Sequence, residues 1–310
     1  MARTGSVIVV THNSADCIQA CLAAIADARG WGILVIDNAS ADSTTTVARR
    51  VAPQVSMISN QQNIGFAAAV NQGVRATQDE ILVVMNPDVV ANGNALDLLA
   101  ETLRSERVAA ASGALMSSEG RVTKGFNLRR FPTLPSALCE VLLLNKAWPH
   151  NPINRRYRCL DLDYMKPQEV EQPAGACLAF RRTAWAQVEG WDDGFFPVWF
   201  EDVDFCRRLT QAGWHIQYCP EAGFTHLGGQ SVGKLRFGDR QAFWYRNLLR
   251  YFHKHHPKWQ VAVLRFGMAT GLAFRCLLSL FVRSRPGMPL REVLSGYIRA
   301  AWYYAVLGRS

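Results

Sequence analysis

Two kinds of phosphate-binding loop are missing from this sequence. No GxGxxG segment follows the first apolar run, and no GxxxxGK[ST] segment occurs anywhere in the 310 residues. These glycine-rich loops hold dinucleotides in dehydrogenases and nucleoside triphosphates in P-loop enzymes. Their absence argues against both classes, so a nucleotide would have to be held by side chains and a metal ion.

CxxC pairs are also missing, although the chain has eight cysteines. A zinc ribbon or a thioredoxin-type site would need such pairs. No signal peptide is recognisable, because the apolar run at residues 6–10 is short and has the pattern of a strand. We therefore expect reduced thiols in the cytosol, most of them ordinary core residues.

Charge is scarce and unevenly distributed. Charged residues make up 19% of the chain and apolar residues 49%, which is typical of a folded globular protein. Residues 1–228 contain 20 Lys/Arg and 23 Asp/Glu, whereas residues 229–310 contain 14 Lys/Arg and 2 Asp/Glu. A basic C-terminal segment of this kind favours an anionic membrane surface or a nucleic acid as its partner.

The N-terminal half alternates between strand and helix patterns. Short β-branched and apolar runs predict strands at residues 6–10, 32–36, 55–59 and 80–85. Apolar residues at helical spacing predict helices at residues 15–28, 43–51 and 65–75. This alternation predicts an α/β fold with a doubly wound, mostly parallel sheet flanked by helices.

Polar side chains follow three of the predicted strands. These clusters are Thr11-His12-Asn13, Asp37-Asn38 and Asn86-Pro87-Asp88. Asn, Asp, Ser and Thr also favour turns and helix caps, so one such cluster would mean little. Ligands of doubly wound sheets bind beyond the carboxyl ends of the strands, so three clusters there favour a ligand site.

The second half is less regular. Residues 120–172 have the pattern of long loops with one helix near residues 136–144. Further strands are predicted at residues 177–180 and 214–218, and further helices at residues 184–188 and 201–212. Gly213 is expected to end the last of these helices as its C-terminal cap.

Three acidic residues begin the predicted helix at 201–212. Glu201, Asp202 and Asp204 directly follow the aromatic run at residues 195–200. A carboxylate at a helix N-terminus is often there only because of the helix dipole. Several carboxylates packed near apolar rings raise each other's pKa, which suits a general base that removes a proton from a hydroxyl group.

A metal ion is the other expected chemical component. Asp88 and Asn86 offer hard oxygen ligands of the kind that bind Mg²⁺ or Mn²⁺ together with diphosphate oxygens. His226 follows the late predicted strand, and its nitrogen would favour Mn²⁺. A single histidine is as often structural, and both interpretations of His226 stay open.

Six segments and His226, in order, resemble the family 2 glycosyltransferases of the GT-A fold, and most closely their bacterial rhamnosyltransferase-like branch. The segments are Val7-Ile8-Val9-Val10-Thr11-His12-Asn13, Val35-Ile36-Asp37-Asn38-Ala39-Ser40, residues 63–73, Met85-Asn86-Pro87-Asp88, Pro173-Ala174-Gly175-Ala176 and Phe200-Glu201-Asp202-Val203-Asp204. One segment alone would be weak support. Together they cover residues 6 to about 233 in the order that the family has.

The resemblance implies a site for a nucleotide-sugar. Thr11 and Asn13 would line the base and ribose pocket, and Asp37, with Asn38 beside it, would hydrogen-bond the imide edge of uracil or thymine. The rest of this predicted site consists of Asn63, Gly65, Phe66, Asn71 and Asn86.

The resemblance also implies the catalytic and acceptor groups. Asp88 would bind the metal ion that bridges the diphosphate, with His226 as a possible second ligand. Asp202 would deprotonate the acceptor hydroxyl, and Glu201 would position the acceptor. Gly175, Ala176 and Trp199 are the residues expected to line the acceptor site.

One departure from the family pattern affects the metal. Many relatives have Asp-x-Asp where this chain has Asn86-Pro87-Asp88, so an amide replaces one carboxylate and metal binding should be weaker. The Asn-Pro-Asp form is itself typical of the rhamnosyltransferase-like branch. The predicted reaction is an inverting transfer of a sugar, with L-rhamnose as one candidate, from a dTDP- or UDP-sugar to a lipid-linked glycan of the cell envelope.

The predicted domains are a GT-A domain at residues 1–233 and a basic helical tail at 234–310. Within the first, residues 1–115 would bind the nucleotide-sugar and residues 116–233 the acceptor. The apolar run 261–282 is long enough to span a bilayer, but Arg265 and Arg275 interrupt it. We expect a helix in the membrane interface whose arginines reach anionic headgroups, on the cytoplasmic face of the plasma membrane. The alternative is a helical hairpin packed on the main domain.

Two rival functions remain possible from the residues alone. Basic and aromatic side chains that alternate in the tail can bind RNA. However, the carboxylates of Asp37, Asp88 and Glu201 would repel RNA phosphates. A nucleotidyltransferase on a similar sheet would need a basic, glycine-rich loop after the first strand, and Thr11-His12-Asn13-Ser14 is not one. We therefore expect no nucleic acid partner, and the sequence gives no indication of the oligomeric state.

Overall fold

The computed structural model describes residues 4–228, 233, 235–281 and 289–306. The chain forms two compact units. Unit 1 comprises residues 1–131 and 158–233, and unit 2 comprises residues 132–157 and 234–310. The sequence-based division placed 132–157 in the first domain, whereas in the structure these residues pack with the C-terminal helices.

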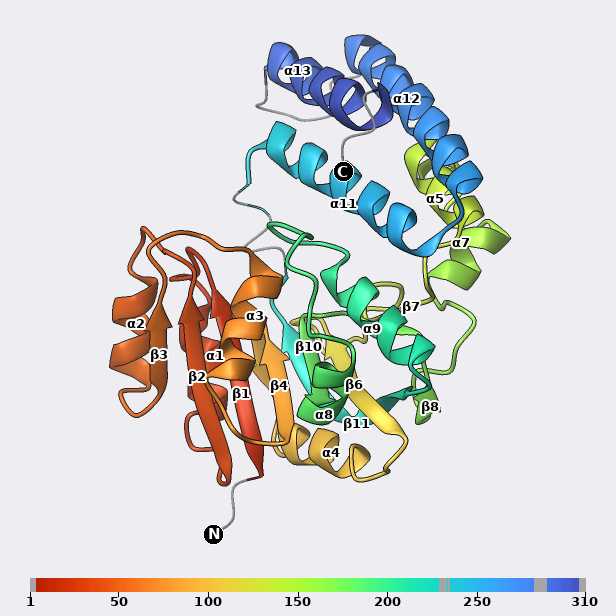
Figure 1. Ribbon diagram of the computed structural model, residues 1–310. Helices are drawn as coiled ribbons and strands as arrows, with labels where there is room; N and C mark the ends of the chain where they lie inside the picture. The colour runs from red at the N-terminus through yellow and green to blue at the C-terminus, as the bar shows by residue number, and fades with distance from the viewer. Residues whose placement is uncertain (1–3, 229–232, 234, 282–288, 307–310) are drawn as a thin grey trace. The chain divides into compact units, whose positions relative to one another are not determined.

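Unit 1 is an α/β unit, and Figure 1 shows its elements. In chain order they are β1 (Gly5–Thr11), α1 (Ile18–Ile25), β2 (Trp31–Asp37), α2 (Thr44–Val51), β3 (Ser56–Ser59), α3 (Phe66–Arg75), β4 (Ile81–Met85), β5 (Val89–Ala91), α4 (Ala95–Thr102), β6 (Val108–Met116), β7 (Leu128–Arg129), β8 (Gln168–Glu169), β9 (Gln172–Pro173), β10 (Cys177–Arg181), α8 (Arg182–Gln187), α9 (Glu201–Gln211) and β11 (His215–His226).

A single large sheet forms the centre of unit 1. Its strand order is β3-β2-β1-β4-β10-β6-β11-β5, and β8 pairs with β11. Strands β1, β2, β3, β4, β6 and β11 run in one direction, while β10, β5 and β8 run in the other. The sheet is therefore mostly parallel, as predicted, with β10 inserted as a reversed strand at its centre.

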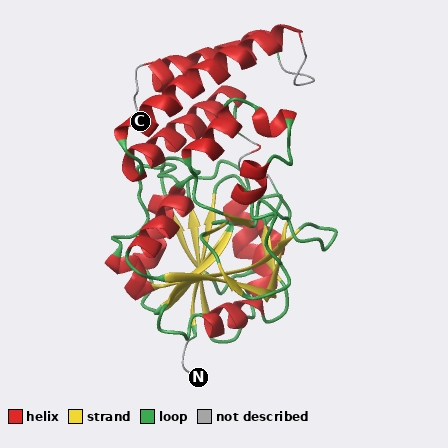
Figure 2. Ribbon diagram, turned by 90° about the vertical axis from the view of Figure 1, so that its right-hand side faces the viewer, coloured by secondary structure: helices red, strands yellow, loops and turns green. Residues whose placement is uncertain are grey.

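Helices cover both faces of this sheet (Figure 2). Val7 and Val9 of β1 point into a core that α1, α2 and α4 cover. Ile8, between them in sequence, faces α3 on the other side. A Cβ atom at Gly73 would lie only 2.5 Å from the Ile8 side chain, so α3 approaches the sheet where it has no side chain. This alternation along β1 explains how a β-branched run is buried on both faces.

The strands and helices predicted for the N-terminal half are all present, with shifted bounds. The helix predicted at 15–28 is shorter, because α1 covers only Ile18–Ile25 and its flanks form turns. Other parts of unit 1 and residues 120–172 were predicted incompletely. Strands β5 and β6 and helix α4 were not predicted, and β11 continues eight residues past the predicted end at Tyr218. Residues 120–172 contain β7, β8, α6 and α7 in addition to α5, which corresponds to the helix predicted near 136–144.

Unit 2 is helical. Its elements are α5 (Leu134–Val141), α6 (Leu144–Ala147), α7 (Pro152–Tyr157), α11 (Phe237–His255), α12 (Lys258–Phe281), α13 (Leu290–Ala300) and the π-helix η1 (Ala301–Val306). A capping box begins α5, since the Ser136 N–H donates to Thr133 Oγ1 and the Thr133 N–H donates to Ser136 Oγ at 2.9 Å.

Helices α5 and α12 pack closely because α12 has a glycine at the contact. A Cβ atom at Gly271 would lie 2.0 Å from the Val141 carbonyl oxygen. Arg275, one turn further along α12, donates to the carbonyl groups of Glu140 (3.1 Å) and Val141. These carbonyls lie at the end of α5, where the helical hydrogen-bond pattern stops, and the Glu140 carbonyl also accepts from the Leu143 N–H at 3.3 Å.

This contact corrects one expectation from the sequence. Arg275 was expected to reach anionic headgroups, but its guanidinium group caps α5 instead. An arginine in the middle of an apolar helix is thus satisfied by protein carbonyl groups. Val282, the last residue of the predicted apolar run, lies outside the described residues.

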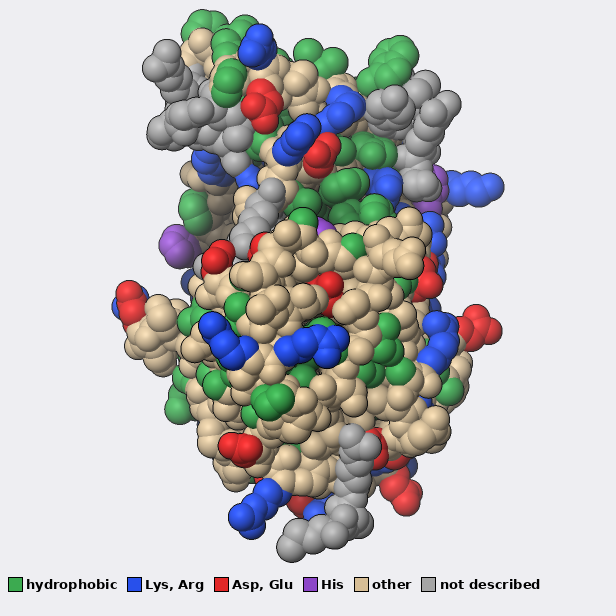
Figure 3. All heavy atoms as spheres, turned by 90° about the vertical axis from the view of Figure 1, so that its left-hand side faces the viewer, with side chains coloured by type: hydrophobic (Ala, Val, Ile, Leu, Met, Phe, Trp, Pro, Cys, Tyr) green, Lys and Arg blue, Asp and Glu red, His purple; other side chains and the backbone are tan. Residues whose placement is uncertain are grey.

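Among the described residues, α12 is the one helix whose length and composition would allow it to cross a membrane, and 33% of its most apolar window is buried. Large apolar side chains of unit 2 are exposed, including Phe266 (76%) and Phe281 (79%) of α12 and Trp302 (57%) of η1. Figure 3 shows apolar and Lys/Arg side chains side by side on one face of unit 2, with a few acidic side chains among them. Unit 2 therefore combines exposed apolar residues with positive charge.

Candidate functional site

The ends of β1, β2 and β4 place the predicted polar residues at one edge of the sheet. Thr11 is in register with Asp37, and the Asn38 N–H donates to the Thr11 carbonyl at 2.8 Å. Strand β4 lies on the other side of β1, in parallel, so Asn86 also follows a strand at this edge. Thr11 Oγ1 is buried and has no hydrogen-bond partner in the described structure, so it can bind a ligand.

Asp37 is held in a fixed orientation at the end of β2. It is 3% exposed, and Ser40 binds both of its carboxylate oxygens. The Ser40 hydroxyl donates to Oδ1 at 2.5 Å and the Ser40 N–H donates to Oδ2 at 3.2 Å. Ser40 was not predicted as a functional residue, although it lies in one of the family-like segments.

Asn13 and Asn38 shape the backbone around Asp37. Asn13 has a positive φ of 51°, and its side-chain oxygen accepts from the Ala41 N–H at 2.7 Å. Its own N–H donates to Ser40 Oγ at 2.8 Å. Asn38 is 2% exposed and donates through Nδ2 to the Gly65 carbonyl at 3.0 Å. The loops after β1 and β2 are thereby joined to the start of α3.

The segment before α3 is tied to a distant loop. Asn63 Oδ1 accepts from the Gly65 N–H at 2.9 Å, and the Phe66 N–H donates to the Pro197 carbonyl at 2.8 Å. Gly65 has φ +86°, and a Cβ atom there would lie 2.9 Å from the Phe196 ring. Only glycine meets both demands, so the family-like segment 63–73 positions the loop that leads to α9.

Asn71 is a buried anchor of that same loop. Its Nδ2 donates to the Trp191 carbonyl (2.8 Å) and to Asp193 Oδ1 (2.7 Å). Its Oδ1 accepts from the Trp185 indole and the Trp191 N–H, both at 3.0 Å. The amide group is saturated by the protein. The structure therefore gives Asn71 a role in shaping the site rather than in contacting a ligand.

Asp88 and His226 lie together at the candidate metal site. Asp88 is 4% exposed, its Oδ1 accepts no hydrogen bond in the described structure, and His226 Nε2 lies 3.5 Å from it. The His226 ring stacks on Phe126, with centroids 5.1 Å apart. Within the described residues, no group of three or more His, Cys, Asp or Glu side chains is arranged to hold a metal ion. These two side chains fit a metal ion whose other ligands come from a diphosphate and water.

Asp202 is fixed by the start of β10. Its Oδ2 accepts from the Gly175 N–H at 2.8 Å and from Gln172 Nε2 at 3.3 Å. A Cβ atom at Gly175 would lie 2.8 Å from the Asp202 Cβ, so residue 175 must lack a side chain. Burial raises the pKa of Asp202, while the hydrogen bonds from Gly175 and Val203 and the charge of Arg129 oppose this rise.

Glu201 is the more deeply buried of the two acids. It is 4% exposed, and its Oε2 has no hydrogen-bond partner in the described structure. Burial, with a smaller contribution from the charge of Asp202, raises the pKa of Glu201 well above its ordinary value. Burial thus raises the pKa of both acids, and hydrogen bonds from Gly175 and Val203 oppose the rise at Asp202.

The backbone just before α9 is strained. Trp199 has φ 79° and Phe200 has φ 70°, values that residues with a side chain rarely adopt. Such strain persists only where the surrounding structure imposes it. The result is that helix α9 begins abruptly at Glu201, with the half-buried Trp199 next to it.

The candidate donor and acceptor sides are connected through two neighbouring residues. The Asn86 N–H donates to the Ala176 carbonyl at 2.9 Å, and the Gly175 N–H donates to Asp202. Sequence reasoning missed Gln172 and Arg129, which lie on the paired strands β9 and β7 and face Asp202. Nothing in their local sequence marks them, because they are brought to Asp202 only by the pairing of these short strands.

Comparison with known proteins identifies related sequences along the chain. Residues 6–187 match the family described as glycosyl transferase family 2, and residues 154–308 match glycosyl transferase family group 2. The chain is 29% identical over 294 residues to the N-acetylglucosaminyl-diphospho-decaprenol L-rhamnosyltransferase of Mycobacterium tuberculosis, covering 90% of this chain and 92% of that protein. It is 25% identical over 228 residues to the rhamnosyltransferase WbbL of Escherichia coli K12, covering 71% and 82% respectively.

Solved structures show the same fold. The mannosyltransferase PcManGT of Pyrobaculum calidifontis, in complex with GDP-Man and Mn²⁺, matches with a TM-score of 0.58 at 17% identity and covers 100% of this chain and 89% of that one. GalNAc-T7 with UDP, GalNAc and Mn²⁺ matches with a TM-score of 0.59 at 13% identity, covering 99% and 56%. The predicted GT-A fold is confirmed.

The environment of Glu201 predicts a pH-dependent stability. Its pKa is raised above the ordinary value of 4.5, so the folded protein keeps a proton that the unfolded chain releases above that pH. Glu201 therefore destabilises the fold increasingly as the pH rises. We expect Glu201→Gln to raise Tm at neutral pH, with a gain that shrinks as the pH is lowered toward 4.5. The exposed Glu106→Gln serves as control, and parallel Tm profiles of wild type and Glu201→Gln would contradict a raised pKa.

Proposed function

The chain belongs to glycosyl transferase family 2, and on that premise we propose that it transfers L-rhamnose from a dTDP- or UDP-linked donor to a polyprenyl-diphosphate-linked glycan. The supporting observation is the set of three buried acidic groups: Asp37, which Ser40 holds at the end of β2, Asp88, which lies 3.5 Å from His226, and Asp202, whose pKa is raised by burial. The rhamnosyl donor and lipid-linked acceptor are inferred from the names of the two relatives.

Asp37 is the group proposed to recognise the base. An imide presents one N–H donor, and the fixed carboxylate at the end of β2 accepts it. Uracil and thymine have the same imide edge, so Asp37 selects for these bases without distinguishing them. Thr11 Oγ1 supplies a hydrogen-bonding group at the neighbouring strand end.

Asp88 and His226 are the proposed protein ligands of a divalent cation, Mg²⁺ or Mn²⁺. Such an ion neutralises the negative charge that builds up on a departing diphosphate. An oxygen from Asp88 and a nitrogen from His226 lie near enough to share one ion. Nitrogen ligation favours Mn²⁺ over Mg²⁺.

Asp202 is proposed as the general base. It removes the proton from an acceptor hydroxyl while that oxygen forms a bond to the anomeric carbon of the sugar and the bond from this carbon to the diphosphate oxygen breaks. Attack from the face opposite the diphosphate inverts the configuration. Burial raises the pKa of Asp202 toward the range that suits a base, and Gly175 and Gln172 hold its carboxylate in place.

Unit 2 is proposed to attach the protein to the cytoplasmic face of the plasma membrane. It carries 17 Lys/Arg and 3 Asp/Glu, a net charge of +14. Its exposed apolar residues on α12 and η1 suit the boundary between headgroups and acyl chains, and its charge suits anionic lipids. A lipid-linked acceptor lies in the same membrane, so this attachment brings enzyme and acceptor together.

To test the assignment of Asp202, we would measure the rate at which nucleotide is released from dTDP-, UDP- and GDP-sugars. The acceptor in this assay is an N-acetylglucosaminyl-diphospho-prenol. We expect dTDP- or UDP-rhamnose to be used and Asp202→Asn to slow release by about 100-fold or more, because the amide cannot take the proton. Donor binding, measured by calorimetry, should persist. Glu106→Gln, at the opposite end of the sheet, is the control, and near-normal turnover by Asp202→Asn would remove Asp202 as the base.

The metal site is tested by the binding of dTDP or UDP with and without Mn²⁺. Asp88→Ala should abolish the increase in affinity that Mn²⁺ produces, and His226→Ala should reduce it by about tenfold, as expected for the loss of one ligand. Asp27→Ala, an exposed acid after α1, should leave the metal effect intact. Unchanged Mn²⁺ dependence in Asp88→Ala would place the site elsewhere.

Membrane attachment is tested by co-sedimentation with anionic liposomes. Replacing Phe266 and Phe281 by serine should weaken binding roughly tenfold, because both lose apolar area that the membrane would bury. Met165→Ser is the matched control, since Met165 is 78% exposed but belongs to unit 1. Equal binding of all three proteins would exclude α12 as the attachment surface.

A further inference from the structure

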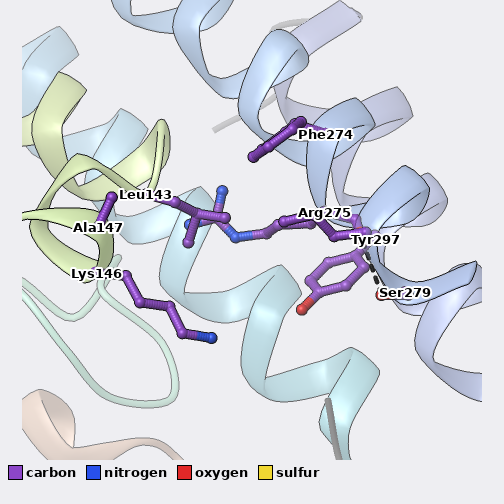
Figure 4. Close-up of a pocket in the computed structure, with 8 residues that line it drawn as sticks. Leu143, Lys146, Ala147, Phe274, Arg275, Ser279 and Tyr297 are labelled. Carbon is purple, nitrogen blue, oxygen red and sulfur yellow. Dashed lines mark hydrogen bonds between the residues drawn. The ribbon is translucent and has the colours of Figure 1, made fainter. Parts of the chain in front are cut away.

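A cavity of about 360 Å³ lies within unit 2 (Figure 4). Its walls come from residues around α6 and from α12 and α13, and the lining residues are Leu143, Lys146, Ala147, Phe274, Arg275, Leu278, Ser279 and Tyr297. The volume is at the lower end of the range of about 300–1,000 Å³ that small-molecule pockets have. The catalytic groups proposed above belong to unit 1, so they leave this cavity unexplained.

The wall of the cavity is mostly apolar. Phe274 and Leu278, which are 47% and 36% exposed, line it from α12 and connect it with the protein surface. Two of its polar residues are occupied by the protein. Ser279 Oγ donates to the Arg275 carbonyl at 2.7 Å, and the Arg275 guanidinium donates to α5. A ligand of this cavity therefore needs a hydrocarbon part.

One end of the cavity carries a positive charge. The Lys146 ammonium group and the Tyr297 hydroxyl point toward one another there (Figure 4). Lys146 forms no ion pair with any described residue. An exposed ammonium group with no carboxylate partner, next to an apolar wall, complements a molecule with a hydrocarbon chain and an anionic end.

From these features we infer that the cavity binds an isoprenyl phosphate, with its chain along Phe274 and Leu278 and its phosphate at Lys146. The small volume suits one hydrocarbon chain rather than the two of a glycerophospholipid. Of the two cationic side chains in the lining, Arg275 already donates to carbonyl groups of α5, which leaves the Lys146 ammonium for a single phosphorylated terminus. This inference rests on the proposed function, because it assigns the lipid part of the acceptor to unit 2.

The experiment uses the full-length protein and farnesyl phosphate, which has one isoprenoid chain and one phosphate. Binding is measured by calorimetry and by competition with farnesol and with dioctanoyl phosphatidylglycerol, which has two acyl chains. We expect Lys146→Glu to weaken farnesyl phosphate binding by about tenfold or more, since a charge-assisted contact becomes a repulsion. Lys258→Glu, an exposed lysine of the same unit outside the cavity, is the charge control.

A second pair of variants tests the chain-binding wall. Leu278→Trp fills the cavity and should abolish binding, whereas Leu280→Trp, on the same helix but outside the lining, should not. Farnesol should compete weakly, because it lacks the phosphate. The Tm of each variant would be measured to check that the fold is kept. Lys146 is exposed, so we expect its replacement to leave the core undisturbed.

Four outcomes would overturn the inference. Equal losses in Lys146→Glu and Lys258→Glu would reduce the effect to general electrostatics, and equal effects of Leu278→Trp and Leu280→Trp would exclude the cavity. Tighter binding of phosphatidylglycerol that Leu278→Trp abolishes would make the occupant a glycerophospholipid. If the wild-type protein transfers sugar but does not bind farnesyl phosphate, the inference about the cavity is wrong and the proposed function stands. If it binds farnesyl phosphate but transfers sugar from no donor, the proposed function is wrong and the cavity inference stands.

Discussion

The absence of a side chain at residue 175 is the constraint on which the arrangement of the site depends. Gly175 touches the Cβ of Asp202 and donates its N–H to the carboxylate, while the next residue, Ala176, accepts from the Asn86 backbone. Two adjacent peptide groups at the start of β10 thus fix the distance between the loop that carries Asp88 and the helix that carries Asp202. Strand β10 runs antiparallel between β4 and β6, so the residues just before it lie beside the end of β4, where the Asp88 loop begins, and also near the start of α9.

The polar groups of the site fall into two kinds. Asn71 is saturated by partners within the protein and holds a loop in place, and Asp37 is oriented by Ser40. In contrast, Thr11 Oγ1, Asp88 Oδ1 and Glu201 Oε2 are buried without hydrogen-bond partners among the described residues. Each such atom costs roughly 1–3 kcal/mol. The fold carries this cost at the three places where a base, a cation and an acceptor are proposed to bind, so these ligands would stabilise the protein as they bind.

Much of the first half of the fold was predictable, because β-branched strands and polar residues at strand ends have strong local patterns. Strand β6 was not, since Val-Ala-Ala-Ala-Ser-Gly-Ala-Leu-Met has small residues of low β propensity that become a strand only between β10 and β11. The same limit applies to the site. Asp37, Asp88 and Asp202 were predicted as site residues from local segments. The positions of Gln172 and Arg129 near Asp202 depend on the pairing of β7 with β9, and the contact of Arg275 depends on where α5 ends.

Unit 2 is built from two segments, 132–157 and 234–310, that residues of unit 1 separate in the sequence. This separation has a consequence for the order in which the protein folds. Glu140 at the end of α5 leaves the ribosome 135 residues before Arg275 of α12, which donates to its carbonyl. Domains generally fold as units during synthesis. The described strands of unit 1 have all emerged once residue 226 has left the ribosome, whereas α5 has no α12 to pack against at that point. We therefore expect the sheet of unit 1 to be able to form before the helices of unit 2 pack, so that the surface proposed to attach to the membrane is completed last.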